Sequence, residues 1–118
     1  IVGEQENMEA ISIFPEDDVE KKRKEIIKAI KKVDKKKGVI VLTDMFGGTP
    51  SNLAISVMDE EKVEVVAGVN LPMLIKISSL REKCTIKELI KISQESGRKY
   101  MNVASAFFGE TTNCKKKD

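Results

Sequence analysis

The chain has 118 residues, of which 41% are apolar and 34% charged, and its formal net charge is +2. This length suits one domain with a real core, and the apolar fraction excludes a wholly disordered chain. The near-balanced charge excludes strong attraction to nucleic acid or membranes, and no apolar run approaches the roughly 18 residues of a membrane span. The sequence has no histidine, so no histidine of its own can act as a base, phosphate acceptor or metal ligand. Its two cysteines have no metal-ligand spacing, which favours a reducing cytoplasm.

The first half of the chain predicts a strand, a helix and a second strand. Residues 7–14 alternate apolar and polar positions and stop at Pro15, which predicts a strand. Acidic residues then open a lysine-rich stretch with apolar positions at helical spacing, which predicts a helix over 17–37 ending at Gly38. Interleaved acids and the lack of aromatic residues favour a solvated helix face over a nucleic-acid patch. Residues 39–43 form an unbroken apolar run, typical of a strand covered on both faces.

Helices predominate in the second half. Thr49 is placed to cap a helix over 50–58, with Pro50 as its first helical residue, where a missing N–H costs nothing. The other predicted elements are a buried strand over 63–67, a helix over 72–80, and a helix over 86–100 opened by the capping box Thr85-Ile86-Lys87-Glu88.

This alternation of strands and helices predicts an α/β fold with an open, mainly parallel, doubly wound sheet and helices on both faces. We expect one domain over 1–108 and a polar tail over 109–118, with 103–108 either a helix end or a short strand. Three strands are few for such a sheet. The chain opens at Ile1 without an initiator Met. We therefore expect an N-terminal strand that precedes this sequence.

Two segments fall at the edge where an open parallel sheet binds ligands, beyond the carboxyl ends of its strands: 44–51 and 68–72. In the first, Gly47 and Gly48 form a turn without side chains. The helix that follows leaves the N–H groups of Ser51 and Asn52 without internal partners, which suits a phosphoryl group. The plainer interpretation, that the glycines are only a connecting turn and Asp44 a turn cap, stays open at this point.

The second segment carries the residues expected to meet a partner. Asn70 and Pro72 are also compatible with an ordinary helix entry, and Leu71 with plain core packing. If the two segments share one site, Phe46 and Leu71 supply apolar surface for docking another protein, with Asn70 and Pro72 beside them.

Three blocks of residues together resemble the mannose-class enzyme IIA domain of the bacterial sugar phosphotransferase system. They are Gly3–Asn7 (GEQEN), Thr43–Asn52 (TDMFGGTPSN) and Ala67–Leu74 (AGVNLPML). They occur in the family's order and at its spacing, and the similarity runs from Ile1 to about Gly97. Each block alone is weak evidence, but the three together are specific.

The resemblance implies a parallel sheet of order 2-1-3-4 and a C-terminal antiparallel strand exchanged between the subunits of a homodimer. It also implies a cytoplasmic phosphotransferase that accepts a phosphoryl group from phospho-HPr on a histidine and passes it to a IIB domain. In that family the histidine lies at the tip of the first strand, about a dozen residues before this sequence begins. Neither that strand nor the histidine is present here, and the strand would lie between the second and third.

The residues that do match the family surround that histidine. Asp44 matches the aspartate that accepts a hydrogen bond from it, which fixes its tautomer and makes the other nitrogen more nucleophilic. Thr49 matches the hydroxyl residue beside the phosphoryl group, and Gly47 and Gly48 let the backbone approach the anion. Phosphoryl transfer needs mainly positioning and charge stabilisation. No cofactor or metal is expected.

Two alternatives remain from the sequence. One is a regulatory or dimerisation module of the same fold that is never phosphorylated. The other is a receiver-like domain phosphorylated on Asp44, but receivers need an acidic pair after the first strand and a lysine after the fifth, and no good lysine candidate is present. The sequence indicates neither the transported sugar nor whether a IIB domain is fused.

Overall fold

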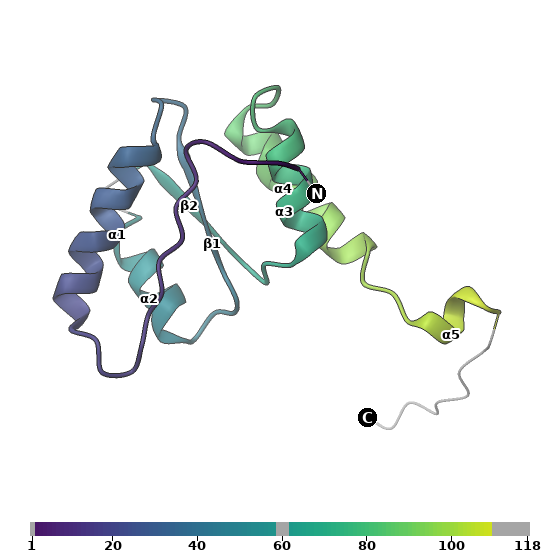
Figure 1. Cartoon of the computed structure of the whole chain (residues 1–118), viewed down its shortest axis with the longest axis horizontal. Helices are drawn as coiled ribbons and strands as arrows, with labels where there is room; N and C mark the ends of the chain where they lie inside the picture. Colours follow the sequence, from purple (N-terminus) through teal and green to yellow (C-terminus); the bar gives the residue numbers. More distant parts are fainter. Residues whose placement is uncertain (1, 59–61, 110–118) are drawn as a thin grey trace.

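The computed structural model describes residues 2–58 and 62–109. Helices and strands alternate through most of this part, as predicted, and none of its helices is long and apolar enough to cross a membrane. The elements are α1 (Val19–Val33), β1 (Val39–Thr43), α2 (Thr49–Ser56), β2 (Val63–Ala67), α3 (Leu71–Leu80), α4 (Ile86–Lys99) and α5 (Ala104–Phe107) (Figure 1).

The two strands pair in parallel, and both have the bounds predicted from their apolar runs. Val39 lies opposite Val63, and the register continues to Thr43 opposite Ala67. In the described ranges the sheet has these two strands alone, so the wider sheet expected from the sequence is not formed by them. The outer edge of each strand has no strand beside it there.

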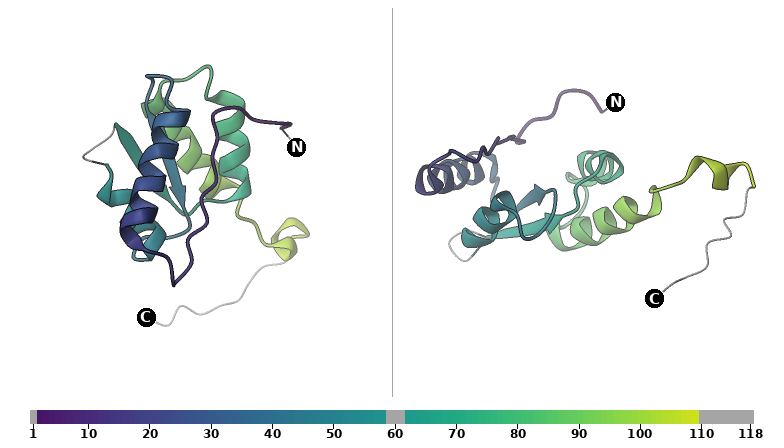
Figure 2. Two further views of the ribbon diagram at one scale, coloured as in Figure 1. Left: turned by 60° about the vertical axis from the view of Figure 1, so that its left-hand side comes forward. Right: turned by 90° about the horizontal axis from the view of Figure 1, so that it is seen from below.

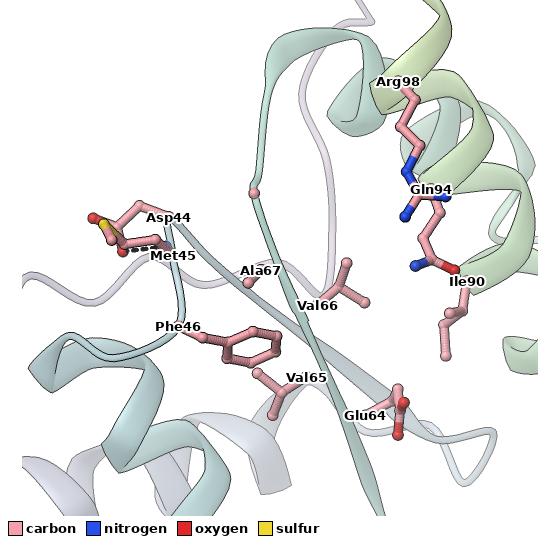
Figure 3. Close-up of a pocket in the computed structure, with 11 residues that line it drawn as sticks. Asp44, Met45, Phe46, Glu64, Val65, Val66, Ala67, Ile90, Gln94 and Arg98 are labelled. Atoms are coloured by element: carbon pink, nitrogen blue, oxygen red, sulfur yellow. Dashed lines mark hydrogen bonds between the residues drawn. The ribbon is translucent and has the colours of Figure 1, made fainter. Parts of the chain in front are cut away.

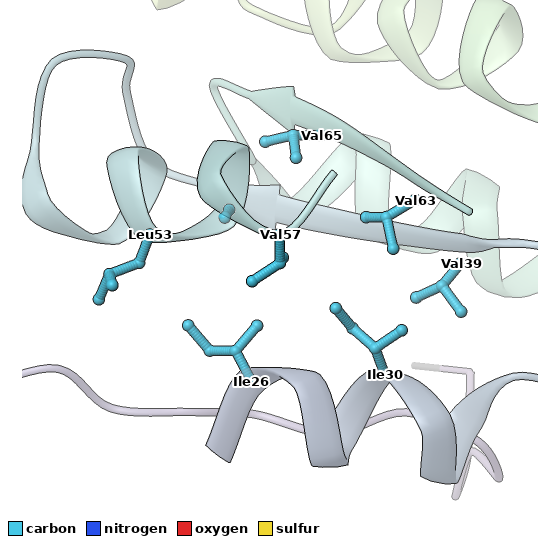
Figure 4. Close-up of a cluster of buried hydrophobic side chains, with 8 residues drawn as sticks. Ile26, Ile30, Val39, Leu53, Val57, Val63 and Val65 are labelled. Carbon is cyan, nitrogen blue, oxygen red and sulfur yellow. The ribbon is translucent and has the colours of Figure 1, made fainter. Parts of the chain in front are cut away.

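Helices cover both faces of this small sheet (Figures 1 and 2). Alternate side chains of the strands point to opposite faces, which divides the core into two clusters. The first cluster joins α1 and α2 to the sheet and contains Ile26, Ile30, Val39, Leu53, Ala54, Val57, Val63 and Val65 (Figure 4). The second joins α3 and α4 to the other face and contains Val66, Met73, Ile77 and Leu89.

The predicted strand over 7–14 is wrong. These residues run without strand pairing, although Ile11 and Ile13 pack against the first cluster as their alternation suggests. The alternating pattern specifies which side chains face an apolar layer, but a strand also needs a neighbouring edge to supply hydrogen bonds. Here the segment lies against the core without such an edge.

One arginine ties the start of this segment to the far end of α3. Arg81 Nη1 donates to the Asn7 carbonyl at 3.2 Å, and its Nη2 donates to Gln5 Oε1 at 3.1 Å and to the Glu6 carbonyl. Further along, Lys32 Nζ lies 2.6 Å from Glu9 Oε1. These contacts hold the segment where strand pairing does not.

The C-terminal strand expected over 103–108 is not present in this chain. Residues 104–107 form the short helix α5, in which the Ala106 N–H donates to the Val103 carbonyl at 3.1 Å. Val103, Phe107 and Phe108 are 65%, 72% and 83% exposed. Without a strand edge in contact, a helical turn satisfies part of the backbone locally. The tail expected over 109–118 lies, apart from Gly109, outside the described residues.

Capping residues set where two of the helices begin or end. The α1 helix stops at Val33, short of the expected 37, because Asp34 turns the chain and its Oδ1 accepts the Lys36 N–H at 2.8 Å. The N-cap predicted at Thr85 is confirmed: Thr85 Oγ1 accepts the Glu88 N–H at 3.2 Å, and the Glu88 carboxylate accepts from the Thr85 hydroxyl at 3.0 Å.

The cap of α4 gives a test of this arrangement. We expect Thr85→Ala to lower the free energy of unfolding by about 1 kcal/mol, because the first turn loses its acceptor. Thr85→Ser keeps the hydroxyl and should unfold at nearly the wild-type urea concentration. A Thr85→Ala midpoint equal to that of wild type would show that the cap contributes nothing to stability.

Candidate functional site

The two segments singled out from the sequence meet at the carboxyl edge of the sheet. The Gly68 N–H donates to the Asp44 carbonyl at 2.8 Å, and the Val69 N–H donates to the Thr43 carbonyl at 3.0 Å. These bonds lie just beyond the last position of the parallel ladder, Thr43 with Ala67, and join the two loops. The prediction that both loops lie at one edge is therefore confirmed.

Asp44 presents its carboxylate at this edge. The residue is exposed, and its Oδ1 accepts the N–H of Met45 at 2.8 Å. That bond orients the carboxylate and leaves Oδ2 without a partner in the part of the chain that the structure describes. Asp44 is thus both a turn cap and an available hydrogen-bond acceptor.

The helix after the glycines begins one residue earlier than expected, and Thr49 is not its cap. Gly48 is the N-cap, in an extended conformation with no side chain to donate or accept, and Thr49 is the first helical residue. The N–H of Asn52 donates to the Gly48 carbonyl at 3.0 Å, so it is not free as the sequence suggested. Thr49 is instead exposed, which leaves its hydroxyl available to a ligand.

Ser51 contributes differently from its neighbours. Its side chain is fully buried, and Oγ donates to the Gly48 carbonyl at 3.0 Å. Its hydroxyl therefore stabilises the loop, and because the whole residue has no exposed surface, its backbone N–H is not presented to an anion as the sequence suggested. Thr43, below this loop, is 6% exposed, and its Oγ1 has no hydrogen-bond partner among the described residues.

Exposed apolar side chains flank the two loops. Met45, Phe46 and Leu71 are 65%, 56% and 57% exposed, and in Figure 3 the Phe46 ring points toward β2 while Met45 points away from it. Pro72 is half-buried, and Asn70 is half-buried with both ends of its amide hydrogen-bonded inside the chain. The sequence analysis did not single out Met45. One feature of the sequence points to it: Met45 is apolar and lies between the candidate residues Asp44 and Phe46.

A hollow of about 500 Å³ lies beside these loops, between β2 and α4 (Figure 3). Sequence reasoning did not find the contribution of α4, because nothing local in a helix predicts which strand it faces. The hollow is lined by Asp44, Met45, Phe46, Glu64, Val65, Val66, Ala67, Gly68, Ile90, Gln94 and Arg98.

A second hollow, of about 340 Å³, lies on the other side of the loop and is bordered by Thr49 and Pro50 from α2. Lys22 also lines it, with its Nζ 3.1 Å from Glu25 Oε2 and 3.8 Å from Asp17 Oδ2. The hydrogen bond to Glu25 is the main cause that raises the pKa of Lys22 above its ordinary value. Within the described residues, no group of three or more acidic or cysteine side chains could hold a metal ion.

Known proteins are similar to this chain in sequence and in fold. The model of the PTS system fructose IIA component family matches residues 1–94. The chain is 35% identical over 101 residues to the fructose-specific EIIA component of Bacillus subtilis, covering 81% of this chain and 69% of that protein. It is 36% identical over 108 residues to the mannose-specific EIIAB component of Escherichia coli, covering 90% of this chain but 33% of that protein.

A solved structure agrees. The PTS IIA protein associated with the fucose utilization operon of Streptococcus pneumoniae superposes with a TM-score of 0.61 at 28% identity, covering 79% of this chain and 68% of that one. The family match and the structural similarity thus identify a phosphotransferase-system IIA domain of the mannose class. The chain belongs to the PTS fructose IIA component family, a family of sugar-uptake components.

The two adjacent glycines of the site differ in backbone conformation, which gives a matched pair of variants. Gly47 has φ +94°, where a side chain is strained, whereas Gly48 has φ −90°. We expect Gly47→Ala to lower the free energy of unfolding by about 1 to 2 kcal/mol, and Gly48→Ala to change it by much less. Urea unfolding of both variants measures this. Equal losses would show that the conformation of Gly47 is not required.

Proposed function

We propose that this chain is the phosphoryl-relay domain of a IIA component, spanning residues 1–108, which works in the cytoplasm. It takes a phosphoryl group from phospho-HPr on a histidine and passes it to a IIB domain. The main support is the joining of the 44–51 and 68–72 loops at one sheet edge, with an exposed carboxylate and exposed apolar side chains around them. Because the sequence has no histidine, the acceptor must come from residues outside it.

Asp44 has the geometry for its proposed role. The Met45 N–H holds Oδ1, and Oδ2 is left to accept the N–H of an imidazole. A carboxylate in that position fixes the imidazole tautomer and stabilises positive charge on the ring, so that the other nitrogen attacks phosphorus. The bond from phosphorus to the donor then breaks as the bond to the imidazole forms, with no water involved.

The start of α2 suits the transferred group. The N–H of the exposed Thr49 and the helix dipole favour an anion, and Gly47 and Gly48 leave room for the approach. The exposed hydroxyl of Thr49 provides a further donor at the same end. Charge stabilisation and positioning of this kind are what phosphoryl transfer requires.

Asp44→Asn tests the role of the carboxylate in the full-length protein. We expect transfer from labelled phospho-HPr to fall about ten- to one-hundredfold, the range for losing a hydrogen bond to a charged group. Thermal melting should be unchanged, because the amide oxygen still accepts the Met45 N–H. A folded Asp44→Asn protein with the wild-type rate would reduce Asp44 to a turn residue.

Thr49→Val is the companion variant. Since Gly48 rather than Thr49 caps α2, this change should leave stability nearly intact while removing one donor to the phosphoryl group. Label found on Asp44 in a form sensitive to hydroxylamine would favour the receiver-like alternative. A full-length protein that takes up no label would favour the non-phosphorylated module.

We also propose that the protein is a homodimer. Val103, Phe107 and Phe108 are exposed apolar residues, and the outer edge of β2 has no strand beside it in the described ranges. In such a dimer, the 103–108 segment of each subunit would lie as a strand along the outer edge of β2 of the other subunit. This exchange would cover the exposed apolar side chains and the unpaired strand edge. The α5 turn would convert to a strand on association.

Sedimentation at micromolar concentration measures the state of association. We expect a dimer for the wild type and a monomer for Phe107→Asp, because a charge in that segment opposes its burial. A monomeric wild type would contradict the proposal.

A further inference from the structure

Asn70 makes an unusual pair of hydrogen bonds that links the second loop of the site to α4. Its Oδ1 accepts the Met73 N–H at 3.1 Å and caps α3. Its Nδ2 donates to the Gly97 carbonyl at 2.9 Å, across 27 positions of sequence. Because one partner is a backbone donor and the other a backbone acceptor, the orientation of the amide is fixed by its surroundings.

The Gly97 carbonyl needs this donor. It lies in the last turn of α4, where carbonyl groups have no N–H four residues further on within the helix. The Tyr100 N–H bonds to Ser96, and within the described residues the Asn70 amide is the donor that reaches Gly97. The bond therefore satisfies a helix end and fastens two elements together.

The identity of residue 97 fits this contact. A Cβ at Gly97 would lie 3.2 Å from Met73 Cε and 3.5 Å from both Nδ2 and Oδ1 of Asn70. The contact with Met73 is tight, and the end of that flexible side chain would have to shift by a few tenths of an ångström, whereas the two Asn70 distances are ordinary contacts. The neighbouring α4 positions that face α3 are also small: Ser93 and Ser96 are buried.

We propose that Asn70 is a positioning residue: its amide holds the exposed Leu71 in place for partner docking and sets the end of α4 that carries Gln94 and Arg98. This goes beyond the proposed relay and rests on it. The loop is fastened on both sides, since Gly68 bonds to Asp44 at one end and Asn70 bonds to Gly97 at the other. Asn70 itself, expected from the sequence to meet the partner, has its amide engaged within the chain.

Asn70→Asp separates the two hydrogen bonds. Aspartate caps a helix as well as asparagine does, so the bond to Met73 is kept. The donor to Gly97 is lost, and a carboxylate oxygen then faces a carbonyl oxygen. Ser79→Ala removes an exposed hydrogen bond to Ile75 elsewhere on α3 and is the control.

The assay is transfer of label from the full-length phosphorylated protein to the purified IIB domain of its own transport system, at varied IIB concentration. For Asn70→Asp we expect KM for IIB to rise about tenfold, the equivalent of one lost hydrogen bond, with kcat within about twofold of wild type. Leu71→Ala should also raise KM. If Asn70 acts through Leu71, the double variant should show less than the product of the two effects.

Three results of this assay would overturn the inference: an unchanged KM in Asn70→Asp, a fall in kcat alone, or fully multiplicative effects with Leu71→Ala. A wild-type protein that transfers no label would instead overturn the proposed relay. Nuclear magnetic resonance on the same variants tests the positioning without any activity. The backbone amide signals of Leu71 and Arg98 should both shift in Asn70→Asp and stay in place in Ser79→Ala, and unmoved signals in Asn70→Asp would refute the link.

Discussion

The parallel pairing of β1 with β2 is the interaction on which the rest of this structure depends. Its register ends with Thr43 opposite Ala67, so the residues that follow each strand leave the sheet together, and two further backbone bonds tie them. The same pairing places alternate side chains against α1 and α2 on one face and α3 and α4 on the other. A one-residue slip would turn every strand side chain to the wrong face and separate Asp44 from Gly68.

Polar groups at the sheet edge divide into those used to build it and those left for a ligand. Ser51 and Asn70 use their side chains on backbone carbonyls of the chain itself, and Asn52 uses its N–H on Gly48. Asp44 and Thr49 remain exposed. For the proposed relay this separation has a consequence: the groups proposed to bind the phosphoryl group would not have to break structural bonds to do so.

Sequence patterns were most informative where the signal is local. The apolar runs of β1 and β2 and the capping box at Thr85 predicted real elements, because burial on both faces and cap chemistry are encoded within a few residues. The strand predicted over 7–14 was wrong, because an alternating apolar and polar pattern does not indicate whether another strand lies alongside to pair with it. Thr49 was misplaced by one position, since Gly48 can adopt the extended cap conformation without a side chain. Arg98 and the bond from Asn70 to Gly97 depend on tertiary packing and leave no local signal.

The contacts of Arg81 have a consequence for the order of folding. Its hydrogen bonds reach residues 74 and 76 positions away, whereas the strand pair and the α3–α4 pair join neighbouring parts of the chain. Closing a longer loop costs more chain entropy, and contacts between distant residues form more slowly than local ones. We therefore expect the sheet with its helices to assemble first, and the N-terminal segment to be fastened by Arg81 as one of the last events on the path to the native state.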